Sequence, residues 1–158
     1  MGNKDLVTQK LKKVIDEVEI HIQRVEIAFE NLKKHNITFP LQDDIYDILE
    51  DDVLLAFADQ IIYRFSKAQD TIGAKLFKAF LLYEGEEVNK PFRDILDRFE
   101  AMDIIDVDEW FELREIRNEI AHDYDNNEER AKDILNLIYE NKNEIKKLVS
   151  KIKSFIKE

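Results

Sequence analysis

Hydrophobic residues recur every three or four positions along most of this chain, which is the spacing of one face of an α-helix. The first run covers about residues 5–35, and Asn36 and Pro40 end it. Its apolar positions are Val7, Leu11, Val14, Val18, Ile22, Val25, Phe29 and Leu32. This regular stripe predicts a long amphipathic helix, and a shorter run at residues 44–50 predicts one or two further helical turns.

A second long run covers about residues 53–84 and follows Asp51 and Asp52, either of which can cap a helix. Gly85 is a natural stop for the same helix. Gly73 lies inside the pattern, where glycine costs roughly 1 kcal/mol relative to alanine. We therefore expect another helix to approach closely at Gly73. The apolar positions of this run are Leu54, Ala58, Ile61, Phe65, Ala68, Ile72, Leu76, Ala79 and Tyr83.

Three further helices are predicted in the second half of the chain. The first begins at about Pro91, a residue that suits the first position of a helix. The second runs from the capping-box pattern Asp106-x-x-Glu109 to about Tyr124. After a polar Asp-Asn-Asn turn, the third covers about residues 128–155. The apolar positions of the three are Phe92, Ile95, Leu96, Phe99; Trp110, Leu113, Ile116, Ile120; and Ala131, Ile134, Ile138, Ile145, Leu148, Ile152, Phe155.

Together these runs predict an all-α protein, an up-and-down helical bundle of four main helices plus one or two short helices. The chain of 158 residues contains only 3 glycines and 2 prolines, which argues against a loop-rich β-sandwich. No internal repeat or flexible linker divides the sequence, so we expect a single domain over residues 1–158.

Composition and charge narrow the class of protein. The sequence has no cysteine, which excludes disulfides and thiolate metal sites and is typical of a reducing cytoplasm. No apolar run approaches the roughly 20 residues of a membrane span, and no signal peptide is apparent, so we expect a cytoplasmic protein without a membrane partner. With 24 Lys+Arg against 35 Asp+Glu, the net charge of −11 argues against a general nucleic-acid binder, though not against a local grip on one or two phosphates.

The three histidines do not form a metal-binding pattern. No two are spaced four residues apart on a helix, and the sequence does not carry the two Glu-x-x-His motifs of a di-iron bundle. A Gly-rich phosphate loop is absent as well. We therefore expect neither a metal nor a cofactor, and we interpret His21 as a helix-flank side chain and His35 as a partner of a helix C-terminus.

The segment from Arg114 to Tyr124 gathers cations, an amide, an imidazole and a phenol at one predicted helix end. Cleavage of RNA without a metal needs an acid or base that titrates near neutral pH, which His122 can supply. It also needs a fixed cation for the charge on the phosphate, which Arg117 can supply. Asn118 shares a helical stripe with His122 and can orient its ring. Taken alone, these residues fit an ordinary polar helix end equally well.

The spacing of the arginine and the histidine raises a geometric question. On an ideal helix Arg117 and His122 lie about 140° apart, so one helix cannot direct both side chains at the same phosphate. Either the helix ends early, around His122, or two copies of the motif meet across a two-fold axis. The residues alone leave both alternatives open.

From Arg117 to Tyr124 the residues read R-x-x-x-x-H-x-Y. This motif resembles that of HEPN-domain proteins of the HepT type, in which an asparagine such as Asn118 commonly follows the arginine. The preceding stretch Asp-Glu-Trp-Phe-Glu-Leu-Arg-Glu-Ile-Arg-Asn is similar to the approach helix of HepT and of the related nucleotidyltransferase substrate-binding proteins. Residues 57–80 resemble the long helix that packs against it. The resemblance covers about residues 50–155, and the N-terminal part matches less clearly.

The resemblance implies a homodimeric, metal-independent endoribonuclease that acts as the toxin of a toxin–antitoxin pair, with RNA as its substrate. In this family the two Arg/His motifs face each other at the dimer cleft. Arg117 would stabilise the scissile phosphate, His122 would be the acid or base, and Asn118 would support them. The implied antitoxin is a separate minimal nucleotidyltransferase of the MntA type, which transfers AMP to the motif tyrosine, Tyr124.

Two other functions remain open. The same bundle could be a non-catalytic substrate-binding or adaptor subunit of a nucleotidyltransferase complex, in which the motif serves as a modification site or a nucleotide contact. More remotely, it could be a structural helical oligomer. The acidic net charge is in tension with RNA binding, and a lysine row on the last helix would relieve it unless that row is only a solvated face. The row consists of Lys142, Lys146, Lys147, Lys151, Lys153 and Lys157.

Overall fold

The computed structural model describes residues 2–120 and 127–156. Within these residues every regular element is a helix, which confirms the predicted all-α class. The helices are α1 (Gly2–Lys34), α2 (Asp44–Glu50), α3 (Asp52–Thr71), α4 (Phe77–Tyr83), α5 (Phe92–Ala101), α6 (Val107–Ile120) and α7 (Glu128–Ser154), with a π-helical turn, η1 (Ile72–Leu76), between α3 and α4.

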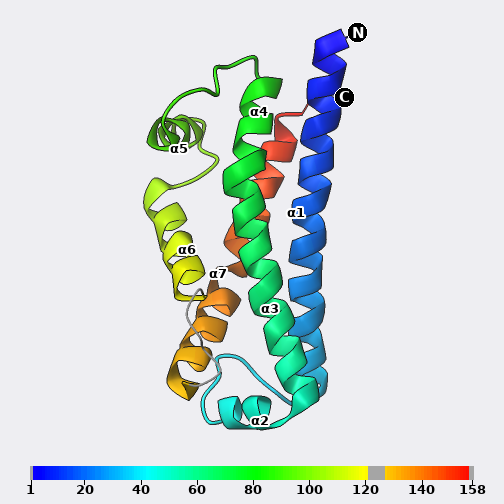
Figure 1. Ribbon diagram of the computed structural model, residues 1–158, viewed down its shortest axis with the longest axis vertical. Coiled ribbons are helices and arrows are strands. Elements are labelled where there is room, and N and C mark those ends of the chain that lie inside the picture. Colours follow the sequence, from blue (N-terminus) through cyan, green and yellow to red (C-terminus); the bar gives the residue numbers. More distant parts are fainter. Residues whose placement is uncertain (1, 121–126, 157–158) are drawn as a thin grey trace.

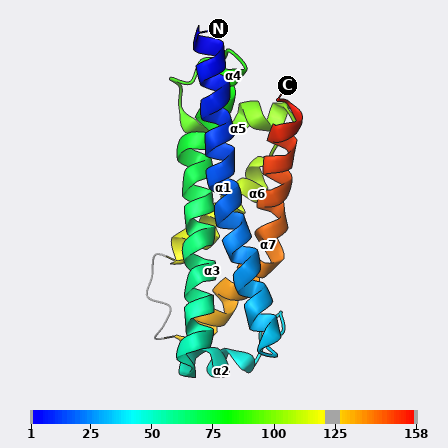
Figure 2. The ribbon, with the colours of Figure 1, turned by 90° about the vertical axis from the view of Figure 1, so that its right-hand side faces the viewer.

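The long helices lie side by side and alternate in direction (Figure 1). α1 runs toward the end of the molecule that holds α2, and the continuous rod of α3, η1 and α4 returns. α6 then runs in the direction of α1, and α7 returns again. Figure 2 shows α1 lying over both α3 and α7, and it contacts both. The expected up-and-down bundle is confirmed, with α2 and α5 as its short helices.

One contiguous cluster of buried hydrophobic side chains holds the helices together. Between α4, α5 and α6 this core is aromatic, and the ring centroid of Phe77 lies 4.5 Å from that of Phe99 and 5.1 Å from that of Trp110. Burial of one such ring stabilises a fold by about 1.5–3 kcal/mol. The aromatic contacts therefore fix α6, which carries the first half of the predicted motif, against the rod of α3 and α4.

The helix ends follow the predicted capping signals. Asp51 caps α3, because its Oδ1 accepts hydrogen bonds from the backbone N–H groups of Val53 (2.9 Å) and Leu54 (3.1 Å). Gly85 follows α4 with a φ of 77°, the left-handed conformation that glycine adopts without strain. Pro91 directly precedes α5 instead of occupying its first position. The sequence signals thus locate these helix ends closely.

The rod contains one feature that the hydrophobic period does not predict. Residues Ile72–Leu76 form a π-helical turn, which inserts an extra residue into the helix. Gly73 lies in this turn, and a Cβ built on it would lie 3.6 Å from Cζ2 of Trp110 in α6. α6 therefore approaches the rod at Gly73 as expected. Because 3.6 Å is ordinary van der Waals contact, however, the approach does not require a glycine.

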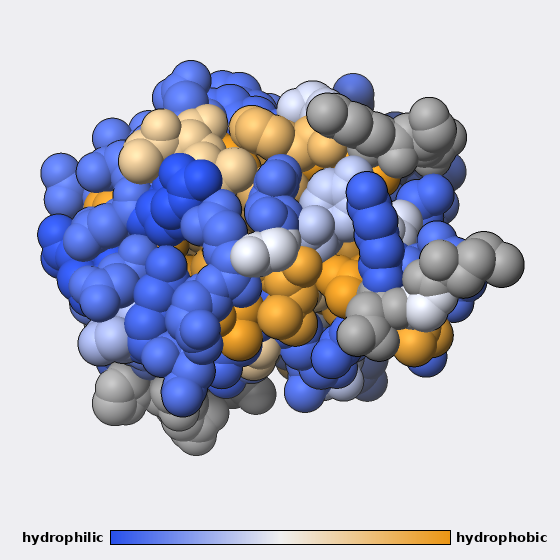
Figure 3. All heavy atoms as spheres, turned by 90° about the horizontal axis from the view of Figure 1, so that it is seen from above, coloured by the Kyte–Doolittle hydropathy of each residue, from blue (hydrophilic) through white to orange (hydrophobic). Residues whose placement is uncertain are grey.

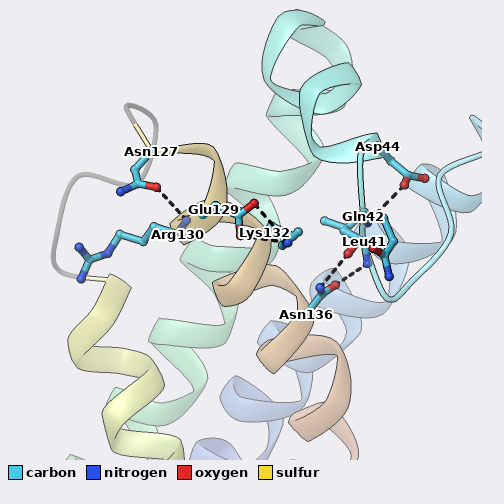
Figure 4. Close-up of polar contacts among 8 residues, drawn as sticks. All are labelled: Leu41, Gln42, Asp44, Asn127, Glu129, Arg130, Lys132 and Asn136. Carbon is cyan, nitrogen blue, oxygen red and sulfur yellow. Dashed lines mark hydrogen bonds and ion pairs between the residues drawn. The ribbon is translucent and has the colours of Figure 1, made fainter.

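Asn136 of α7 holds the segment between α1 and α2 (Figure 4). Its Oδ1 accepts a hydrogen bond from the N–H of Leu41 at 2.6 Å, and its Nδ2 donates to the Leu41 carbonyl at 3.1 Å. Asn127 caps α7 by accepting a hydrogen bond from the N–H of Arg130 at 3.0 Å. Side-chain hydrogen bonds therefore define both the start of α7 and its contact with the loop before α2.

The end of the bundle at which α1 begins shows hydrophobic residues between hydrophilic ones (Figure 3). Near this end Phe80 of α4 packs edge-on against Phe155, with ring centroids 5.6 Å apart, and Leu82 is exposed.

Among the described residues, no helix combines the length and the apolar character that crossing a membrane requires.

Candidate functional site at the contact between α3 and α6

α6 carries the first half of the predicted motif and is anchored at its start. Oδ1 of Asp106 accepts a hydrogen bond from the N–H of Glu109 at 3.0 Å, as the capping-box pattern predicts. Glu100 accepts a hydrogen bond from the N–H of Val107 at 2.8 Å. Trp110, which is 2% exposed, packs on the rod. These contacts determine which face of α6 meets α3.

Arg117 lies on the face of α6 that meets α3, where it binds Asp70. Its Nε donates to Oδ1 of Asp70 at 3.1 Å and its Nη2 donates to Oδ2 at 3.3 Å, a two-pronged arrangement. Arg114, one turn earlier, places Nη1 3.8 Å from Oδ1 of the same carboxylate. The side chains of Asp70, Arg114 and Arg117, here called the seam cluster, are 41%, 42% and 30% exposed. Two guanidinium groups thus share one carboxylate within reach of solvent.

Only part of the predicted site falls within the described residues. Arg117 and Asn118 lie in the last part of α6, and Asn118 is exposed. His122 and Tyr124 belong to residues 121–126, which lie outside the described residues. The relation between Arg117 and His122 therefore stays a prediction.

Asp70 is a site residue that no motif in the sequence indicates. It is one of 35 acidic residues, and an exposed carboxylate on a helix has no characteristic pattern. Its bond to Arg117 joins positions that are 47 residues apart. Its place one turn before Gly73, where a close approach of a second helix is expected, is the one signal that could have pointed to it.

The two described histidines contact neighbouring helical groups. Nδ1 of His21 accepts a hydrogen bond from Nη1 of Arg64 at 3.1 Å. Burial in the first place, and the positive charge of Arg64 in the second, lower the pKa of His21 below its usual 6.5. Nδ1 of His35 lies 2.8 Å from the carbonyl oxygen of Asn31, at the end of α1. Both contacts agree with the structural interpretation of these histidines.

Glutamates form ion pairs with most of the described lysines in the row on α7. Burial alone would raise the pKa of Glu26, but the hydrogen bond from Lys146 and the charge of Lys142 outweigh it and lower the pKa. Lys157 lies outside the described residues. Lys142 and Lys146 share Glu26, while Lys147 and Lys153 each bind a glutamate of their own, and this pairing favours the interpretation of the row as a solvated helix face. The pairs are Lys142–Glu26, Lys146–Glu26, Lys147–Glu144 and Lys153–Glu19.

A groove between α5, α6 and α7 has an apolar floor and a largely acidic rim. Trp110 and Leu113 contribute to the floor. Burial, followed by the charges of Glu144 and Asp106, raises the pKa of Glu109 on the rim. Because carboxylates repel a polyanion, this groove does not suit RNA.

The seam cluster, by contrast, is chemically suited to an anion. Guanidinium groups present paired N–H donors that match the oxygens of a phosphate, and the cluster has one more cation than it has carboxylates. Among the described residues, no group of His, Asp and Glu side chains could hold a metal ion. No protein-family model matches the chain, and no curated protein or solved structure is significantly similar to it.

Proposed function

We propose that the chain is the toxin component of a HEPN/nucleotidyltransferase toxin–antitoxin pair and acts as a metal-independent endoribonuclease. The observation that carries the proposal is the R-x-x-x-x-H-x-Y motif, whose first residue, Arg117, is held at a solvent-accessible contact between two helices. A guanidinium that is fixed in this way can stabilise the negative charge of a reacting phosphate.

In the proposed reaction, the 2′-oxygen of a ribose attacks the adjacent phosphorus. The 2′-O–P bond forms while the P–O5′ bond breaks, which leaves a 2′,3′-cyclic phosphate and a 5′-hydroxyl. A base takes the proton of the 2′-hydroxyl and an acid protonates the leaving O5′, and His122 serves in this proton transfer with support from Asn118. Arg117 balances the charge on the phosphate oxygens.

Assembly and regulation complete the proposal. We expect a homodimer, because one ideal helix cannot direct Arg117 and His122 at the same phosphate. The partner nucleotidyltransferase would inactivate the toxin by transferring AMP from ATP to the phenolic oxygen of Tyr124, with release of pyrophosphate and the phenolic proton; Tyr124 is only two residues from His122. The added phosphate would compete with RNA for the guanidinium of Arg117, and the nucleoside would block the approach of the substrate.

The test is RNA cleavage by the purified protein in the presence of EDTA. We expect His122→Ala to reduce the rate by about 10²–10⁴-fold, as the loss of a general acid or base does. Arg117→Ala should reduce it by about 10²–10³-fold, as the loss of a charge-stabilising donor does. Arg98→Ala is the matched control, because Arg98 binds Glu86 in the same two-pronged way, through Nε (2.7 Å) and Nη2 (2.9 Å). Undiminished cleavage by His122→Ala, or a requirement for added metal, would refute the assignment.

A second candidate is the non-catalytic substrate-binding or adaptor subunit. The pairing of the α7 lysines with glutamates favours it, because a wide RNA footprint requires cations that are free to neutralise phosphates. An adaptor would bind the nucleotidyltransferase in a light-scattering measurement but would cleave no RNA at any concentration. The toxin would do both.

A further inference from the structure

We propose that Asp70, Arg114 and Arg117 form a phosphate-binding site, in which Asp70 orients Arg117 and Arg114 supplies a second positive charge. The ligand is a phosphodiester group of single-stranded RNA, so the inference rests on the proposed function. Asp70 is a positioning residue, because it acts on the ligand through Arg117.

Asp70 engages only one edge of the Arg117 guanidinium. Its two carboxylate oxygens accept hydrogen bonds from Nε at 3.1 Å and from Nη2 at 3.3 Å. A guanidinium carries five N–H donors, so both N–H groups of Nη1 and the second N–H of Nη2 lie outside this pair. That remaining edge has the fork geometry that binds two oxygens of one phosphate. Asp70 therefore fixes the plane of the guanidinium without taking its outer edge.

The seam cluster carries a net positive charge, which favours the binding of an anion. Nη1 of Arg114 lies 3.8 Å from the same Oδ1 that Arg117 binds, so two cations face one carboxylate. A phosphodiester, with one negative charge, would make the cluster neutral. The similar pair of Arg98 and Glu86 is already neutral, one charge against one. The geometry of the two pairs is alike, and the second arginine distinguishes the seam cluster.

Buried neighbours hold the cluster in place on both helices. On α3, Ala68 and Gln69 are 1% and 0% exposed, and the π-helical turn begins two residues after Asp70. On α6, Leu113 and Ile116 are each 4% exposed on either side of Arg114. The backbones that carry the three side chains are thus packed into the core. The orientation of Arg117 therefore depends on a rigid contact between two helices.

Phosphate binding is tested with a 2′-deoxy oligonucleotide, which cannot be cleaved because it lacks the attacking hydroxyl. Its Kd is measured by fluorescence anisotropy over a series of KCl concentrations. One phosphate contact to a single strand contributes about 0.7 to the slope of log K against log salt. Arg114→Gln should lower the slope by about this amount and weaken binding. Arg98→Gln, which removes a paired arginine elsewhere, should leave the slope unchanged.

Positioning is tested with an RNA substrate and Asp70→Asn. We expect kcat to fall on the order of tenfold to a hundredfold, because a misplaced group loses its reactive geometry. KM should not rise, since the variant is one charge more positive. Asp70→Glu keeps the charge and should recover part of kcat, and Glu86→Gln should change neither constant. The emission of Trp110, the single tryptophan, checks that the contact between α3 and α6 is intact in each variant.

The outcomes separate this inference from the proposed function. An unchanged salt slope in Arg114→Gln would remove Arg114 from the site, and a raised kcat in Asp70→Asn would show that Asp70 competes with the phosphate. If the wild type cleaves no RNA but Arg114→Gln lowers the slope, the reaction is wrong and the phosphate site stands. If the wild type cleaves RNA and both variants behave like it, the function stands and this inference is wrong.

Discussion

Replacing Gly73 by alanine adds one methyl group at the contact between the π-helical turn and α6. Alanine is roughly 1 kcal/mol more favourable than glycine inside a helix, chiefly because it restricts the unfolded chain. Gly73 is not among the residues with positive φ, and its added Cβ would meet Cζ2 of Trp110 at 3.6 Å, an ordinary contact. Without a steric cost, the free energy of unfolding should rise by about 0.5–1 kcal/mol.

The assay is urea and thermal unfolding followed by circular dichroism. For a chain of this size, 1 kcal/mol shifts Tm by about 2–4 °C. Gly85→Ala is the matched control with the opposite sign, because the φ of 77° at Gly85 disfavours a residue with a Cβ by about 1–2 kcal/mol. If Gly73→Ala destabilised the protein as much as Gly85→Ala, the added Cβ would clash with α6. The distance from that Cβ to Cζ2 of Trp110 would then be shorter than the 3.6 Å of the structure. The geometry inferred for the seam cluster would then be wrong as well.

Three further predictions concern other parts of the molecule. Asn136→Ala should lower the free energy of unfolding by about 2 kcal/mol, measured by chemical unfolding, because it removes both hydrogen bonds to the buried backbone of Leu41. Asn141→Ala removes one exposed hydrogen bond and should lower it by less than about 0.5 kcal/mol. The pKa of His21 is lowered in the folded state, so the unfolded chain binds more protons than the folded one and the free energy of unfolding should fall as pH drops below about 6.5. If the stability of His21→Asn depended on pH as strongly as that of the wild type, this prediction would be wrong. If the proposed function is right, incubation with the nucleotidyltransferase proposed as its partner, ATP and magnesium should add AMP to the wild type but not to Tyr124→Phe. Mass spectrometry checks this, and adenylation of both proteins would exclude Tyr124 as the acceptor.

The helices could be predicted because burial imposes the helical period on the sequence. Every apolar position predicted in the first run from Leu11 to Leu32, except the half-buried Ile22, is buried in α1. The ends of the helices could be predicted as well, because capping depends on residues at the helix end itself. Asp51 and Asp106 cap helices with their own side chains, and Gly85 adopts a φ that glycine tolerates. Such features depend on a few neighbouring residues, so the sequence displays them.

The π-helical turn and the seam cluster depend on contacts between distant segments. The one residue that the π-helical turn inserts at Ile72–Leu76 hardly disturbs the spacing of the apolar positions. The hydrophobic period therefore does not indicate the turn. The sequence indicates a phosphate as the ligand of Arg117 but no protein partner for it, and the partner in the structure, Asp70, comes from α3. Which of many acidic residues faces an arginine is decided by how two helices pack, and hydrophobic spacing determines only that they pack. The contact at Gly73 was predictable, and the carboxylate beside it was not.

Net charge and local charge lead to different expectations for RNA. At −11 the whole molecule repels a polyanion, and the paired lysines of α7 and the acidic groove beside α6 do not reverse this. In the seam cluster the arginines outnumber the carboxylate, so a phosphate close to it is attracted even though a distant one is not. A ribonuclease that acts through this cluster would therefore hold only a few phosphates near the scissile bond. Its affinity for RNA would depend weakly on salt, and a second copy of the cluster in a dimer would roughly double that dependence.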